Sequence, residues 1–110
     1  MSFFDSRIVQ KEVEEITELQ EKIYSKMYSF ASMSNEDKIH HIEMLEDLLN
    51  RQQIMFTRMN LSEDPQAKEM RDQIMKASHE LGFPENVNLN YVLSKMGDVV
   101  SNMKESLKEN

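Results

Sequence analysis

The sequence predicts an all-α domain of four helices that pack as an antiparallel bundle, and three observations support this fold class. Apolar residues recur at steps of three and four along four separate stretches, which is the spacing of one helix face. The chain has only two Gly and two Pro, so a fold rich in hairpin turns is excluded. The breaks between the stretches hold only a few residues, so consecutive helices are expected to be antiparallel neighbours.

The first predicted helix covers about residues 5–32. Asp5 is its expected N-cap, and Phe4 and Val9 are spaced as the hydrophobic staple that often surrounds such a cap. The apolar face then comprises Val9, Val13, Ile16, Leu19, Ile23, Met27 and Phe30.

The second predicted helix covers about residues 35–60. Ser34 is a favourable N-cap, and acidic residues in the first turn complement the positive end of the helix dipole. Its apolar seam has the spacing of a coiled coil with one polar member and comprises Ile42, Leu45, Leu49, Gln52, Phe56 and Met59.

The third predicted helix covers about residues 63–81, with Pro65 in its first turn and Gly82 as the signal that ends it. The fourth covers about residues 88–108 and contains Gly97 in its interior. This glycine either belongs to a strip of small residues that lets another helix approach closely, or is tolerated on the surface. The apolar stripe of the fourth helix comprises Leu89, Leu93, Met96, Val100, Met103 and Leu107, flanked by Val92 and Val99.

These lengths describe a single domain over residues 1–110 with two longer helices followed by two shorter ones. The longer pair would extend beyond the shorter pair, so the apolar ends of the longer helices would remain uncovered in a monomer. A homodimer that buries this overhang is therefore one hypothesis.

Composition excludes several function classes. The absence of Cys excludes a disulfide framework, a cysteine zinc site and a thiol nucleophile. The net charge of −7 is spread evenly along the chain, which argues against nucleic-acid binding. No long apolar run and no secretory signal are visible, so we expect no membrane partner and a cytoplasmic location. The carboxylates fall on polar helix faces and no catalytic arrangement is visible, so we expect no enzymatic activity and no cofactor.

A histidine and carboxylate cluster on the second helix offers an alternative function as a metal-binding protein. Carboxylate and histidine side chains three or four residues apart share a helix face and can form half of a di-metal site. A complete site would need the same pattern on other helices, so a solvated first turn is the other interpretation. The cluster consists of Glu36, Asp37, His40 and His41, to which His79 on the third helix could add a ligand.

The ten Met residues are the least ordinary feature of the composition. Met is flexible and polarisable, so it fills cores and also lines adaptable surfaces that bind other proteins. Residues at the edges of the apolar stripes are those that could face a partner. We therefore predict a non-enzymatic interaction or regulatory protein that binds another protein through a helix face, with a candidate contact surface of Phe3, Met33, Met44, Met55 and Met75.

The opening segment SFFDSRIVQ (residues 2–10) resembles the start of a small uncharacterised family found in cyanobacteria and the phages that infect them. A second point of similarity is the segment 51–64, in which a helix rich in Arg, Met and Phe runs into Leu-Ser-Glu-Asp. The similarity extends over most of the chain and is weakest in the last third. The resemblance implies a small helical protein with no established activity, and it supplies no catalytic residue.

Overall fold

The computed structural model describes residues 3–83 and 88–109, and this part of the chain forms four α-helices with no strand. The helices are α1 (Arg7–Met27), α2 (Asn35–Leu61), α3 (Pro65–Glu80) and α4 (Leu89–Glu109). Two short 3-10 turns, at Phe3–Asp5 and Phe30–Ser32, precede α1 and α2. The predicted all-α class with four helices is confirmed.

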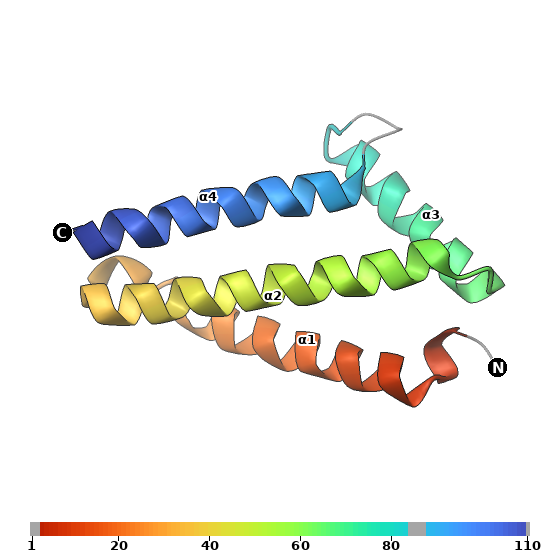
Figure 1. The fold of residues 1–110 in the computed structure, drawn as a ribbon, viewed down its shortest axis with the longest axis horizontal. Helices are drawn as coiled ribbons and strands as arrows, with labels where there is room; N and C mark the ends of the chain where they lie inside the picture. The colour runs from red at the N-terminus through yellow and green to blue at the C-terminus, as the bar shows by residue number, and fades with distance from the viewer. Residues whose placement is uncertain (1–2, 84–87, 110) are drawn as a thin grey trace.

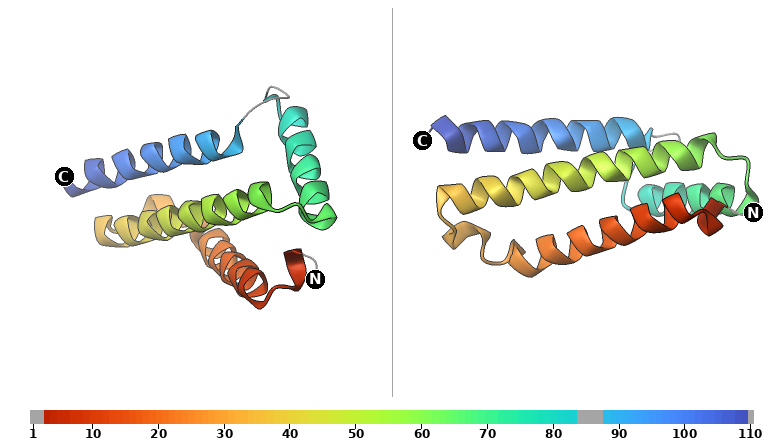
Figure 2. Two further views of the ribbon diagram at one scale, coloured as in Figure 1. Left: turned by 45° about the vertical axis from the view of Figure 1, so that its right-hand side comes forward. Right: turned by 60° about the horizontal axis from the view of Figure 1, so that its bottom comes forward.

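The longest helix, α2, is the centre of the fold. Figure 1 shows α1 and α4 on opposite sides of α2, each running antiparallel to it. The two further views in Figure 2 keep the same order, with α2 between the other two. α3 crosses near the C-terminal end of α2 and contacts both α2 and the first 3-10 turn.

Two details differ from the regular bundle that the sequence predicts. The helices contain 21, 27, 16 and 21 residues, so only α2 is distinctly long and α1 is no longer than α4. α3 and α4 follow each other in the chain but are not antiparallel neighbours, because α4 returns along α2 whereas α3 crosses its end. The arrangement is a layer of three helices with a fourth across one end.

The core is built mainly by α2, which buries side chains along most of its length. Val9 of α1 packs with Met55, Phe56 and Met59 of α2, and half-buried side chains from the first 3-10 turn, α1, α3 and α4 surround this cluster. Ile42, nearer the start of α2, is completely buried. The buried residues of α2 are His41, Ile42, Leu48, Leu49, Met55, Phe56 and Met59, which include four of the six predicted seam positions.

The N-terminal segment is fixed by α3 and not by a helix cap at Asp5. The backbone N–H of Phe3 donates to the Oδ2 atom of Asp64 at 2.8 Å, and the N–H of Phe4 donates to Gln66 at 3.4 Å. Asp64 also caps α3, because its Oδ1 atom accepts from the N–H of Gln66. These contacts hold Phe3–Asp5 as a separate turn, so α1 begins two residues later than predicted.

α1 also ends earlier than predicted, at Met27 instead of near residue 32. Serine hydroxyls in this region donate to backbone carbonyls three residues earlier, including Ser29 to Lys26 at 3.0 Å and Ser32 to Ser29 at 2.9 Å. Such bonds compete with the regular helix ladder. The predicted cap at Ser34 is present, since its hydroxyl accepts from the N–H of Asp37 and starts α2.

The three-helix layer leaves the molecule flat. Its extents are 48 × 32 × 21 Å and its radius of gyration is 15.9 Å. A compact domain of this length has a radius of gyration of roughly 13 Å. Because α1 and α4 each pack mainly on α2, each keeps an outer face that no other helix covers.

We predict that shortening Ile42 weakens the fold more than the same change at an exposed position of α2. Ile42→Val should reduce the free energy of unfolding by about 0.5–1.5 kcal/mol, because it removes a completely buried methyl group. Ile54→Val, on the exposed face of the same helix, should change it by less than about 0.5 kcal/mol. Urea unfolding of both variants measures the difference, and an equal cost at the two positions would contradict this description of the core.

Replacement of the two glycines by alanine should change the stability of the protein in opposite directions. A Cβ added at Gly97 meets no atom within 4 Å, so this glycine is not needed for a close helix approach. Gly97→Ala should therefore stabilise the protein by about 1 kcal/mol through helix propensity. Gly82 has φ of 102°, which L-residues rarely adopt, so Gly82→Ala should destabilise it. Thermal unfolding of the two variants measures both changes in stability. A loss of stability in Gly97→Ala would show that the structure needs a glycine at this position.

Candidate functional site

Three members of the predicted histidine cluster, Asp37, His40 and His41, line a hollow of about 320 Å³ between the end of α1 and the start of α2. His41 is buried there, its ring contacts Phe30 with centroids 5.4 Å apart, and its Nδ1 atom has no hydrogen-bond partner. Burial is the main cause that lowers the pKa of His41 below 6.5, and the charges of Lys26 and His40 lower it further. The residues lining the hollow are Lys26, Ser29, Met33, Asp37, His40, His41 and Met44.

This hollow does not provide the predicted metal cluster. Within residues 3–83 and 88–109, no three His, Cys, Asp or Glu side chains are grouped so that they could hold a metal ion. His79 lies near the C-terminal end of α3, at the other end of the molecule from His40 and His41. Glu36 is exposed and is not among the residues that line the hollow. Lys26 also lines the hollow, and its positive charge, which acts on His41, disfavours a bound cation.

The predicted contact surface is divided by the fold. Phe3 packs against the core cluster at one end of the molecule, whereas Met33 and Met44 line the hollow at the other end. Met75 is half-buried on α3. Met55 is only 7 % exposed and belongs to the core, so it cannot contact a partner from the folded chain. The five residues do not form one surface.

α4 has a run of exposed apolar side chains at helical spacing. Val92, Met96, Val99 and Met103 follow one another at steps of four, three and four, and we call this set the outer strip. Met96, Val99 and Met103 are 48 %, 59 % and 44 % exposed, and Val92 is half-buried. No residue of α4, which is described along its whole length, is fully buried.

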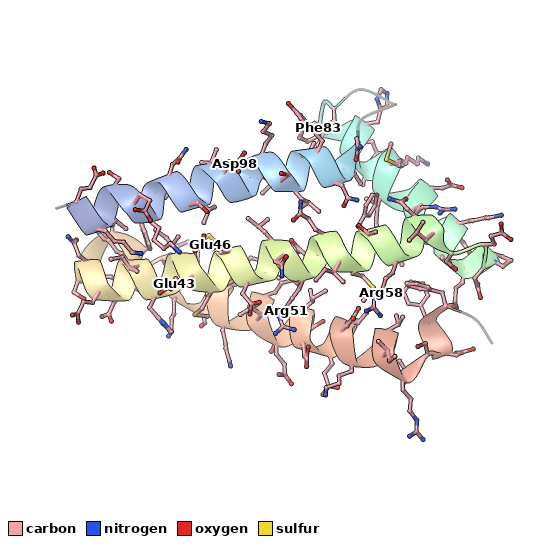
Figure 3. The ribbon with its side chains drawn as sticks, viewed as in Figure 1. Glu43, Glu46, Arg51, Arg58, Phe83 and Asp98 are labelled. Carbon is pink, nitrogen blue, oxygen red and sulfur yellow. The ribbon has the colours of Figure 1, made fainter. Side chains whose placement is uncertain are left out.

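A shallow groove runs beside the outer strip. Its volume is about 450 Å³ and almost all of its lining is apolar. Figure 3 shows Phe83 at the end of α3, above the start of α4, and Asp98 on the outward side of α4. Among the described residues that line the groove, Lys95 is the only charged one, and its ammonium group lies over the ring of Tyr91 at 5.4 Å. The lining residues are Phe83, Tyr91, Val92, Lys95, Met96, Val99 and Val100.

Polar contacts tie the opposite side of α4 to α2. Glu46 of α2 accepts from Lys104 and from Ser101, each at 2.7 Å (Figure 3). Further along, Asn90 of α4 donates to Thr57 at 3.0 Å and accepts through its backbone carbonyl from Gln53 at 3.2 Å. These bonds fix which side of α4 faces α2, and so leave the outer strip toward solvent.

The hydrogen bond from Lys104 is the largest cause that lowers the pKa of Glu46, and the bond from Ser101 adds to it. The same pair raises the pKa of Lys104. The seam between α1 and α2 has similar links, since Arg51 pairs with Glu15 and Arg58 pairs with Glu12. Partly exposed ion pairs add little to stability, so these links mainly set the register of the helices.

Sequence reasoning missed the outer strip because it merged two seams of α4 into one stripe. Leu89 packs against the core cluster of α2, and Leu93, Val100 and Leu107 are half-buried like it. Met96 and Met103, placed in the same stripe by the sequence, lie outside it with the two flanking valines. The width of the apolar arc of α4 could have revealed the outer strip from the sequence, because a helix that packs on one neighbour needs only one apolar seam.

The pair of Glu46 and Lys104 predicts an acid-sensitive attachment of α4. Because the folded-state pKa of Glu46 lies below its ordinary value of 4.5, the pair stabilises the fold above that pH. The stabilisation is lost as the pH falls through the lowered pKa. Glu46→Gln should lower the melting temperature at pH 7 and should lose less stability than the wild type between pH 5 and pH 3.

The matched control for this pH experiment is Glu14→Gln, which neutralises an exposed carboxylate on α1. It should keep the acid sensitivity of the wild type when melting temperatures are compared over the same pH range. Equal acid sensitivity of Glu46→Gln and the wild type would contradict the assigned role of Glu46.

The described helices contain no segment that is both long and apolar enough to cross a lipid bilayer. Comparison with curated proteins gives no match, and comparison with solved structures gives none either. A protein family described as a domain of unknown function (DUF1825) matches residues 1–107. The match covers nearly the whole chain, including all of α1, α2 and α3 and most of α4. The chain therefore belongs to this uncharacterised DUF1825 family.

Proposed function

We propose that this chain is a small non-enzymatic interaction or regulatory protein that binds another protein chain through a helix face, and that this face is the outer strip of α4. One observation carries the proposal: α4 has two apolar seams at helical spacing, and α2 covers one of them. Exposed apolar residues that are contiguous and rimmed by polar ones mark interaction surfaces more often than scattered ones do.

The spacing of the outer strip favours a helix as the binding partner. Steps of four, three and four are those of a coiled-coil seam, into which a second amphipathic helix inserts its own apolar side chains. Met side chains adapt their shape to such a partner. Lys95 and Asp98 lie beside the strip, with Nζ of Lys95 and Oδ2 of Asp98 4.0 Å apart. These charges would orient an approaching partner more than they would add affinity.

Two features of the other polar groups support a non-enzymatic role. Glu46, the carboxylate with the lowered pKa, is engaged by Lys104 and Ser101 in holding α4. His41 is buried against Phe30. Neither group is placed as a general acid or base toward an open site. Metal binding by His40 and His41 remains the alternative hypothesis from the sequence, and no specific observation favours it.

The proposal predicts that a Met96→Glu, Val99→Glu double variant loses its partner. Tagged wild-type and variant chains are used for pull-downs from a cyanobacterial lysate, a source suggested by the resemblance of the opening segment. We expect the wild type to retain a partner near stoichiometry and the variant to bind that purified partner at least about tenfold more weakly. The reason is that each Glu would place an unpaired charge in an apolar contact.

The matched control is an Ile8→Glu, Leu61→Glu double variant, which adds the same charge at two exposed apolar positions away from the outer strip. It should bind the partner as the wild type does. Circular dichroism checks that both variants keep the helical fold. Undiminished binding by the outer-strip variant would show that the contact lies elsewhere.

A further inference from the structure

We propose that the occupant of the outer strip is a second copy of this chain, and that the two α4 helices pack antiparallel about a two-fold axis near the middle of α4. This inference rests on the proposed function and deepens it by naming the partner. It is argued from the surface area of the monomer, the symmetry of the strip and the residues beside it.

The surface area of the single chain is larger than a monomer of its mass requires. Its accessible surface is 7759 Å². A compact monomer of 13.0 kDa exposes about 6,350 Å², so the excess is about 1,400 Å². A stable interface buries about 800 Å² on each partner. The flat shape therefore exposes enough additional surface for one complete interface between copies.

The outer strip is complementary to itself when reversed. Its steps of four, three and four read the same in both chain directions. In an antiparallel pair centred between residues 97 and 98, Met96 of one copy lies opposite Val99 of the other. Val92 likewise lies opposite Met103. Every layer of the contact then joins one Met with one Val, and each pairing occurs twice, which is the self-complementary pattern of an isologous two-fold interface.

The same register suits the residues beside the strip. The groove next to Val92, with Phe83 as one wall, comes to lie opposite the Met103 of the second copy, whose flexible side chain could enter it. Lys95 comes to lie near Asn102 of the second copy and not near another Lys95. The dipoles of the two helices oppose each other. A parallel pair would instead place identical side chains and like helix ends together.

The first test is the mass of the untagged full chain in solution, by light scattering from about 5 to 100 µM. We expect twice 13.0 kDa for the wild type and for the Ile8→Glu, Leu61→Glu control. The Met96→Glu, Val99→Glu variant should have the mass of one chain while keeping its helical circular dichroism. A single-chain mass for the wild type over this range would overturn the second-copy proposal. The proposed function fails only if, in addition, the lysate experiment yields no protein that needs the strip.

Disulfide cross-linking tests the antiparallel register, because the natural chain contains no Cys. Single variants Val92→Cys and Met103→Cys, carrying tags of different size, are oxidised alone and as a mixture. We expect cross-linking only between the two different variants. In the proposed register, the two copies of position 92 are about 16 Å apart along the helix axis, too far for a disulfide. Cross-linking within each variant and none between them would show parallel helices and overturn the proposed pairing.

Discussion

The fold depends on one constraint: α2 must pack on two helices at once, with one apolar face against α1 and another against α4. Its 27 residues provide seven buried side chains, while α1 buries two and α4 buries none. In a closed four-helix bundle every helix has two neighbours, so the burial is shared. Here α1 and α4 pack chiefly on α2, and the fourth helix crosses one end instead of closing the layer.

The candidate site follows directly from that arrangement. A helix at the edge of a layer needs one apolar face for folding, and any second apolar face has no role within the monomer. α4 has such a second face, and the bonds that Ser101 and Lys104 donate to Glu46 determine that it points outward. The strip is therefore the consequence of a fixed helix orientation. This distinguishes it from exposed side chains such as Tyr28, which lies in the turn after α1 and is 98 % exposed.

Features governed by local chemistry could be predicted from the sequence. Four helices, the cap at Ser34, the end of α3 at Gly82 and the buried seam of α2 all follow from spacing and backbone preference, and the structure has them. Features governed by contacts distant in the chain could not be predicted. The turn at Phe3–Asp5 exists because Asp64 accepts its backbone donor, 61 residues away. Met55, which the spacing places at a surface edge, is buried in a cluster with Val9 of α1, against which the N-terminal turn also packs.

The absence of any buried side chain on α4 also has a consequence for local unfolding. Opening of α4 away from α2 breaks the bonds that Ser101 and Lys104 donate to Glu46 and exposes half-buried apolar side chains, so it is a local unfolding step with its own free energy. A ligand that binds only the attached helix lowers the population of the opened state by mass action. Occupation of the outer strip would thus slow amide hydrogen exchange throughout α4, on the α2-facing side as well as on the side that the partner touches.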